Sequence, residues 1–196
     1  MSGAQPLLGM GRWWTVLSAG WLHAGLLHLF FNMMMVRELG PPTAEIYGAA
    51  RMVIIYVIGG VTGFLCSSIA GVVMPQLPLI GGGLYTIGAS APIFGLLGAL
   101  MYYSRRGGSS LVRSAVMGYV LSAVMFGILM PGIDNYAHAG GYLGGYLTGR
   151  WLDPLKRERM DHFFGAMICL AASALAILAS ILTVLPELIM IVRSRY

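Results

Sequence analysis

Six long apolar segments constrain this sequence more than any other feature. They lie at about 19–36, 52–73, 87–104, 112–130, 136–152 and 163–192, separated by charged or Pro- and Gly-rich stretches. Only 10% of the residues are charged, whereas a soluble domain carries about 25%. Because a chain this apolar needs lipid as its solvent, each segment must satisfy its own backbone hydrogen bonds as a helix. We therefore predict an all-α polytopic membrane protein, a helical bundle with about six transmembrane helices.

The basic residues predict how these helices are oriented. The connections 74–86 and 131–135 contain no Lys or Arg, so the positive-inside rule places the more basic connections in the cytoplasm. We expect a multi-pass protein, in the cell membrane if the source is bacterial, with the starts of the helices at 19–36, 87–104 and 136–152 on the non-cytoplasmic side. The net charge of +5 follows from this topology, so no nucleic-acid partner is expected. Nine of the twelve Lys and Arg residues lie in the basic connections: Arg37, Arg51, Arg105, Arg106, Arg113, Arg150, Lys156, Arg157 and Arg159.

Each of these three helices carries an unusual polar residue near its start. In the first, His28 and Asn32 are four residues apart and share a helix face. In the second, Gly88 and Pro92 bracket Ser90 at a helix start, where unpaired N–H groups are available to an oxyanion. Taken singly, each of these polar residues also fits a packing role, in which it only makes hydrogen bonds between helices.

The third helix begins with His138, and small residues suggest how it meets the helix of Ser90. If two small-residue ridges pack face to face, the hydroxyl and the imidazole come within hydrogen-bond reach, as a base-activated nucleophile requires. A metal site is not expected, because His23 and His28 are five residues apart with no carboxylate or cysteine beside them. We predict no cofactor. The ridges consist of Ala91, Gly95 and Ala99 on one helix and Ala137, Gly141, Gly145 and Gly149 on the other.

In combination, these segments resemble the signature segments of the rhomboid family of intramembrane serine proteases. The resemblance covers roughly residues 11–152, including Arg12-Trp13-Trp14 in the loop before the first of the three helices. Each motif alone is weak, whereas all three in this order are specific. The motifs are HLFFN at 28–32, GAS at 88–90 followed by FG at 94–95, and AHAGG at 137–141.

The resemblance implies a Ser–His dyad without an acidic residue. Ser90 would attack the scissile carbonyl, and His138 would act as general base and then as general acid. His28 and Asn32, with the Ser90 N–H, would stabilise the oxyanion. Phe94 matches an aromatic position near the catalytic histidine, and His23 matches a histidine with a structural role. The implied substrates are single-span membrane proteins in the bilayer.

The sequence departs from the family pattern at two places. Ala91 follows the serine where the family usually has glycine, and we expect the methyl group to be tolerated. The family's first helix has no counterpart in residues 1–18, while an additional helix follows the core. We therefore expect a rhomboid-like protease core at 1–155, and a basic cytoplasmic linker with an extra C-terminal transmembrane helix at 156–196.

Two alternatives compete with a protease. A catalytically inactive rhomboid-like protein that binds transmembrane helices would keep the fold but usually lacks the serine or the histidine, whereas this chain keeps both. An unrelated transporter or channel predicts internal repeats and charged residues at membrane depth, and the sequence shows neither.

Overall fold

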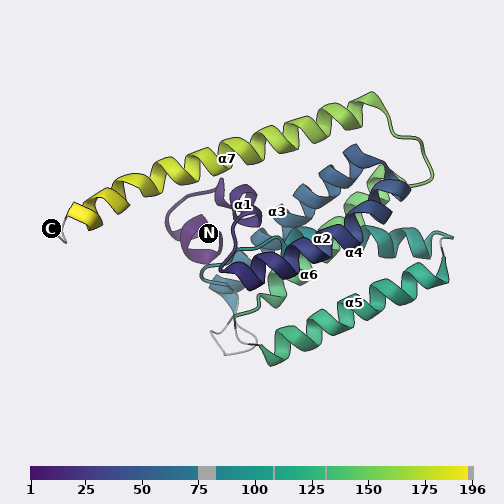
Figure 1. The fold of residues 1–196 in the computed structure, drawn as a ribbon, viewed down its shortest axis with the longest axis horizontal. Helices are drawn as coiled ribbons and strands as arrows, with labels where there is room; N and C mark the ends of the chain where they lie inside the picture. The colour runs from purple at the N-terminus through teal and green to yellow at the C-terminus, as the bar shows by residue number, and fades with distance from the viewer. Residues whose placement is uncertain (75–82, 108, 131, 194–196) are drawn as a thin grey trace.

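A computed structural model of the chain describes residues 1–74, 83–107, 109–130 and 132–193 (Figure 1). Residues 75–82 of the predicted connection 74–86, and residue 131 of the connection 131–135, lie outside the described residues. The predicted all-helical architecture is confirmed. A π-helical turn Gln5–Gly9 and a 3-10 turn Ala19–Trp21 accompany the α-helices, which are α1 Thr15–Ser18, α2 Leu26–Tyr47, α3 Ala49–Val73, α4 Ser90–Arg105, α5 Ser110–Leu129, α6 Asn135–Leu152 and α7 Met160–Arg193.

Three of these helices are long and apolar enough to cross a membrane: Ala49–Val73, Ser110–Leu129 and Met160–Pro186. The pair Thr15–Trp21 and Leu26–Tyr47 would make a fourth span, broken by a bend of 94°. Helix α4 has 16 residues, fewer than the roughly 20 that a span across the hydrocarbon core needs. The other elements bury almost all of its side chains.

The first predicted helix, 19–36, differs from the observed one. Residues 19–25 form a 3-10 turn and a bend, and the helix runs instead from Leu26 to Tyr47, so that Arg37 lies in a helix and not in a loop. Although Pro41 and Pro42 interrupt the backbone hydrogen bonds, packing preserves the helix. The buried Tyr47 hydroxyl donates to the Ala99 carbonyl at 2.9 Å. Gly48, with φ +94°, then makes the whole connection to α3.

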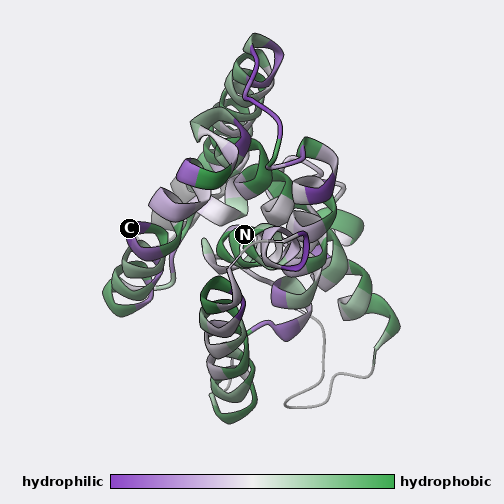
Figure 2. Ribbon diagram, turned by 90° about the vertical axis from the view of Figure 1, so that its right-hand side faces the viewer, coloured by the Kyte–Doolittle hydropathy of each residue, from purple (hydrophilic) through white to green (hydrophobic). Residues whose placement is uncertain are grey.

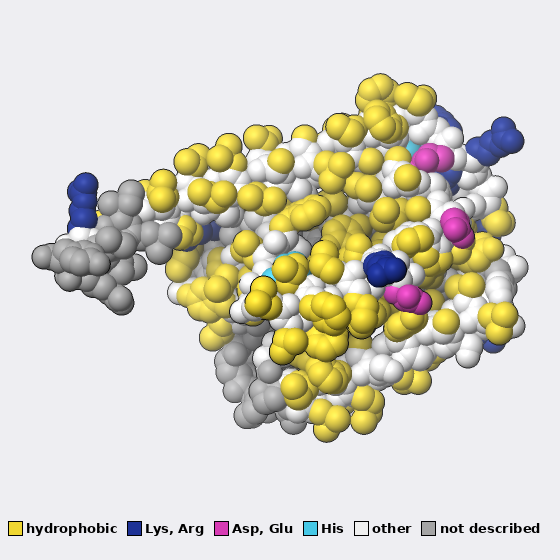
Figure 3. Space-filling model, viewed as in Figure 1, with side chains coloured by type: hydrophobic (Ala, Val, Ile, Leu, Met, Phe, Trp, Pro, Cys, Tyr) yellow, Lys and Arg dark blue, Asp and Glu magenta, His cyan; other side chains and the backbone are white. Residues whose placement is uncertain are grey.

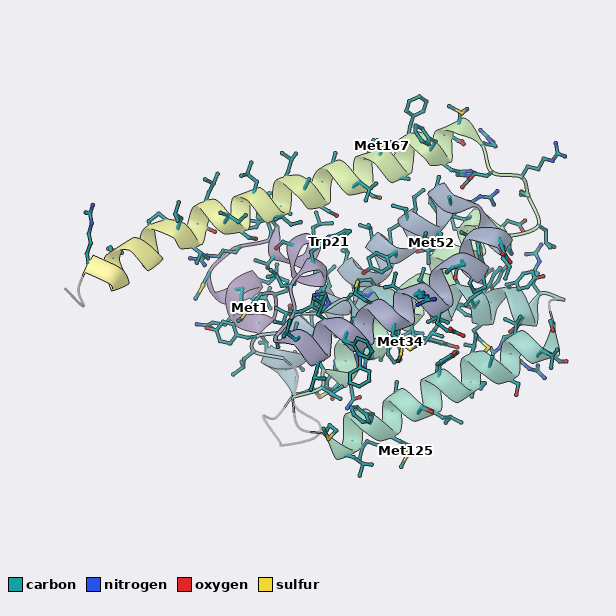
Figure 4. All side chains as sticks on the ribbon, in the orientation of Figure 1. Met1, Trp21, Met34, Met52, Met125 and Met167 are labelled. Atoms are coloured by element: carbon teal, nitrogen blue, oxygen red, sulfur yellow. The ribbon has the colours of Figure 1, made fainter. Side chains whose placement is uncertain are left out.

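Helix α4 forms the centre of the bundle, and α2, α3 and α6 surround it (Figure 1). Helices α5 and α7 lie on opposite flanks, where Met125 and Met167 mark them in Figure 4. Both helices are mostly exposed. Most residues along the helices of the protein are hydrophobic (Figure 2). An exposed apolar surface of this extent suits helices that face lipid.

A buried arginine organises the end of the bundle opposite the starts of α2, α4 and α6. Arg51 is 1% exposed, and its guanidinium donates to the carbonyl groups of Leu152, Asp153 and Lys156 at 2.5–2.9 Å. Its backbone N–H donates to the Glu158 carboxylate at 2.9 Å. On the face shown in Figure 3, most Lys and Arg side chains lie over the right half.

Candidate active site

Ser90 begins α4 at a turn that only a few residue types can form. Gly88, with φ +126°, donates its N–H to the Ala19 carbonyl at 3.1 Å. The first backbone bond of the new helix runs from Ile93 N–H to the Ala89 carbonyl at 3.0 Å. The N–H groups of Ser90 and Ala91 therefore precede the hydrogen-bonded ladder, and they lie next to the partly buried Ser90 hydroxyl.

His138 lies in the first turn of α6. Its backbone N–H donates to the carbonyl of Asp134, the residue that caps the helix, at 3.1 Å. Its imidazole stacks on the ring of Phe94, one turn after Ser90, with the ring centroids 4.2 Å apart and an interplanar angle of 6°. The Nδ1 atom is buried and has no hydrogen-bond partner among the described residues. Ring stacking therefore fixes the plane of the imidazole without help from a carboxylate.

The small-residue ridges of α4 and α6 pack directly against each other below these two residues. A Cβ atom built on Gly141 would lie 3.0 Å from the carbonyl carbon and 3.3 Å from the Cα of Ala91. A Cβ on Gly145 would overlap the backbone of Gly95 in the same way. Only glycine permits so close an approach of two backbones. This packing brings the first turns of the two helices side by side.

The side chains of Ser90 and His138 are not joined by a hydrogen bond in the described part of the chain. The Phe94 stack and the α4–α6 contact nevertheless bring the imidazole and the serine to adjoining first turns. Catalytic hydrogen bonds in substrate-free enzymes are often long and tighten only when a substrate is bound.

His28, the third residue of α2, lies next to Gly88 and close to the Ser90 hydroxyl. A Cβ built on Gly88 would lie 2.7 Å from both Cε1 and Nε2 of His28, and 3.8 Å from the Ser90 hydroxyl oxygen. Because Nδ1 of His28 accepts a hydrogen bond from the Ala24 N–H at 3.2 Å, the neutral ring carries its proton on Nε2. That N–H lies beside Gly88, where a donor would face an oxyanion formed at Ser90.

Asn32 and His23 both contact His28. The buried Asn32 side chain donates to the His28 carbonyl at 2.9 Å, so one of its two amide hydrogens is engaged within α2. His23 packs edge-on against His28, with the ring centroids 5.2 Å apart. No group of three His, Cys, Asp or Glu side chains suited to a metal ion occurs among the described residues.

A cavity of about 600 Å³ adjoins His138 between α4, α5 and α6. Phe94 and His138 form one wall, and the aliphatic side chains Val120, Val124 and Ile128 of α5 form the other. Its size suits an extended peptide segment, since ligand sites typically enclose about 300–1,000 Å³. The sequence alone gave no signal for this space, because it depends on how far α5 stands from α6.

Sequence reasoning also missed Asp134. Its carboxylate caps α6 by accepting the Ala137 N–H at 2.9 Å, and it accepts a hydrogen bond from the Ser67 hydroxyl of α3. An aspartate directly before the first residue of an apolar helix is a typical N-cap signal. The bond to Ser67, by contrast, is formed between residues far apart in the chain.

Comparison with known proteins places this arrangement in a family. A family model described as "Rhomboid domain" matches residues 10–155, which include all of the candidate active-site residues. The chain belongs to the rhomboid family. Its rhomboid relatives include the Rhomboid protease GluP of Bacillus subtilis (strain 168), 33% identical over 147 residues, which cover 74% of this chain and 27% of GluP.

Plant rhomboid relatives are similar to the same part of the chain. RHOMBOID-like protein 7 of Arabidopsis thaliana is 33% identical over 145 residues, covering 69% of this chain and 42% of the relative. RHOMBOID-like protein 5 of the same plant is 33% identical over 157 residues, covering 74% and 46%. The chain thus spans less than half the length of each of these rhomboid relatives.

Proposed function

We propose that this rhomboid-family chain is an intramembrane serine endopeptidase that cleaves transmembrane segments of membrane proteins. The observation that carries the proposal is the His138 imidazole stacked on Phe94, one turn after Ser90, at the junction of α4 and α6. A family relative bears the name protease, which supports the same reaction class.

In this mechanism, the Ser90 oxygen attacks the scissile carbonyl carbon while His138 takes the hydroxyl proton. The carbonyl oxygen becomes an oxyanion, which accepts hydrogen bonds from the Ser90 N–H, the Nε2–H of His28 and the free amide hydrogen of Asn32. The imidazolium then donates its proton to the leaving amine, and the peptide bond breaks. A water molecule, deprotonated by His138, hydrolyses the acyl-enzyme and restores the serine.

No carboxylate is hydrogen-bonded to the imidazole in this scheme. The buried Nδ1 of His138 has no partner among the described residues, and the Phe94 ring sets the plane of the imidazole, which a hydrogen-bonded aspartate helps to set in a triad. A dyad of this kind is consistent with the absence of Asp and Glu from 90–105 and 135–152.

The cavity beside His138 supports a substrate of the membrane-protein class. Its walls are mainly apolar, and an unwound stretch of a single transmembrane segment fits such a space better than a charged peptide does. We propose that single-span membrane proteins are the substrates and that the site opens on the non-cytoplasmic side, where the basic residues are few.

A covalent serine probe tests the proposal against the alternative of a catalytically inactive, helix-binding rhomboid protein. A fluorophosphonate carrying a fluorophore should label the purified chain in detergent. It should not label Ser90→Ala, and labelling of His138→Ala should be strongly slowed. Ser104→Ala is the matched control in the same helix, since its hydroxyl donates only within α4, to the Met101 carbonyl at 2.8 Å and to Met101 Sδ at 3.7 Å. Equal labelling of Ser90→Ala and the unaltered chain would refute the proposal.

A further inference from the structure

The first turn of α6 is fastened to α3 by one side chain. Asp134 Oδ1 accepts the Ala137 N–H at 2.9 Å, Asp134 Oδ2 accepts the Ser67 hydroxyl, and the Asp134 carbonyl accepts the His138 N–H at 3.1 Å. We propose that Asp134 is a positioning residue for His138: through Ser67 it fixes the depth and direction of the imidazole. This inference rests on the proposed protease function and adds a residue to it.

The anchor on α3 is rigid. Ser67 is fully buried, and its neighbour Ser68 is also fully buried and donates to the Phe64 carbonyl at 2.7 Å. Further along, a Cβ on Gly63 would lie 2.6 Å from the Ala137 carbonyl oxygen, so α3 and the first turn of α6 are already in backbone contact. A hydrogen bond from Asp134 to this surface therefore fixes the turn relative to the core of the bundle.

The imidazole needs an anchor of this kind because little else restrains it. Its Nδ1 has no hydrogen-bond partner among the described residues, and its other flank borders the cavity between α5 and α6. Stacking on Phe94 sets the plane of the ring but allows it to slide within that plane. Because helix ends fray first, the backbone of the first turn must be fixed by a cap.

Asp134 can act through its hydrogen bonds without its charge. An asparagine at this position keeps an acceptor for the Ala137 N–H, and its amide nitrogen can donate to the Ser67 oxygen with the donor and acceptor reversed. Alanine removes both bonds. The positioning role therefore predicts that Asp134→Asn retains activity and that Asp134→Ala loses it.

The test measures kcat and KM for cleavage of a fluorogenic transmembrane peptide in proteoliposomes, with Tm in detergent beside them. A displacement of about 1 Å at a reacting group can lower a rate on the order of 10²-fold. For Asp134→Ala we expect kcat to fall at least about tenfold with KM within about twofold, and Ser67→Ala to give a smaller fall in the same direction. Asp134→Asn should restore kcat to within about threefold of the unaltered chain.

The matched control is Ser109→Ala, which removes the side-chain cap of α5, a bond from the Leu111 N–H at 3.1 Å far from His138. Ser109→Ala should lower Tm and leave kcat unchanged. An unchanged kcat in Asp134→Ala would overturn the inference, as would an equal loss of kcat in Asp134→Asn and Asp134→Ala. If Ser90→Ala cleaves as fast as the unaltered chain, the proposed function itself fails, which is a separate result.

Discussion

The contact between Gly141 and Ala91 offers a sharp perturbation of the proposed dyad. Gly141 lies three residues after His138, and Ala91 follows Ser90 directly, so a methyl group inserted here acts immediately beneath both residues. In Gly141→Ala the new Cβ would lie 3.0 Å from the Ala91 carbonyl carbon and 3.3 Å from its Cα. Both atoms belong to the backbone, so no side-chain rotation relieves the overlap.

The size of the effect follows from these distances. Carbon atoms in contact lie about 3.5–4.0 Å apart, and the Ala91 carbonyl oxygen lies nearer still to the new Cβ, so α4 and α6 must separate by at least about 0.5–1 Å. Overpacking of this kind costs about 1–3 kcal/mol of unfolding free energy. A displacement of about 1 Å between reacting groups lowers the rate on the order of 10²-fold, because a proton passes only between atoms about 2.6–3.2 Å apart.

The assay is cleavage of a fluorogenic transmembrane peptide, with kcat, KM and Tm measured for each variant. The control is Gly118→Ala in α5, where a new Cβ meets no atom within 4 Å and the gain in helix propensity is about 1 kcal/mol. We expect Gly141→Ala to lose most of its kcat, while Gly118→Ala keeps its kcat and has an equal or higher Tm. A Gly141→Ala variant with full kcat would refute the claim that close α4–α6 packing aligns the dyad.

Three further predictions concern single side chains. Asn32→Ala and His28→Ala should each slow cleavage about 10²–10³-fold in a single-turnover assay without abolishing it, because one oxyanion donor contributes about 3–4 kcal/mol. Unchanged kinetics in both variants would mean that these two side chains only pack. Phe94→Ala should lower kcat because the ring of His138 loses its stacking partner, whereas Phe94→Tyr should keep kcat since the aromatic face remains. Equal kcat values for Phe94→Ala and the unaltered chain would show that the stack does not contribute to catalysis. Arg51→Ala should lower Tm strongly but spare kcat per folded molecule, because three carbonyl groups each lose a partner worth about 1–3 kcal/mol; an unaltered Tm would contradict this.

Much of the fold could be predicted from the sequence because lipid allows few alternatives. Five of the six predicted helices match α3 to α7 within a few residues, since each is a long apolar run with a polar or Gly-rich break at its ends. The first helix was misplaced because its second half, with Arg37 and two prolines, does not look helical. That part of α2 is stabilised by contacts such as the bond from Tyr47 to the Ala99 carbonyl, which hydropathy does not record.

The sequence predicts the parts of the candidate site that depend on the spacing of residues along one helix. The positions of Ser90 and His138 at helix starts, and the small residues beneath them, were readable from the chain. The bond between Ser67 and Asp134 and the cavity beside α5 depend on the distance between helices, so no local pattern reveals them.

Cleavage by dyad variants tests the central claim most directly. Ser90→Ala and His138→Ala should be reconstituted in liposomes with a single-span membrane protein, beside the controls Ser104→Ala and His162→Ala, the latter at the start of α7. The account predicts that both dyad variants lose activity on the order of 10⁴-fold or more, with unchanged Tm, and that both controls cleave normally. Cleavage at the unaltered rate by either dyad variant would contradict it.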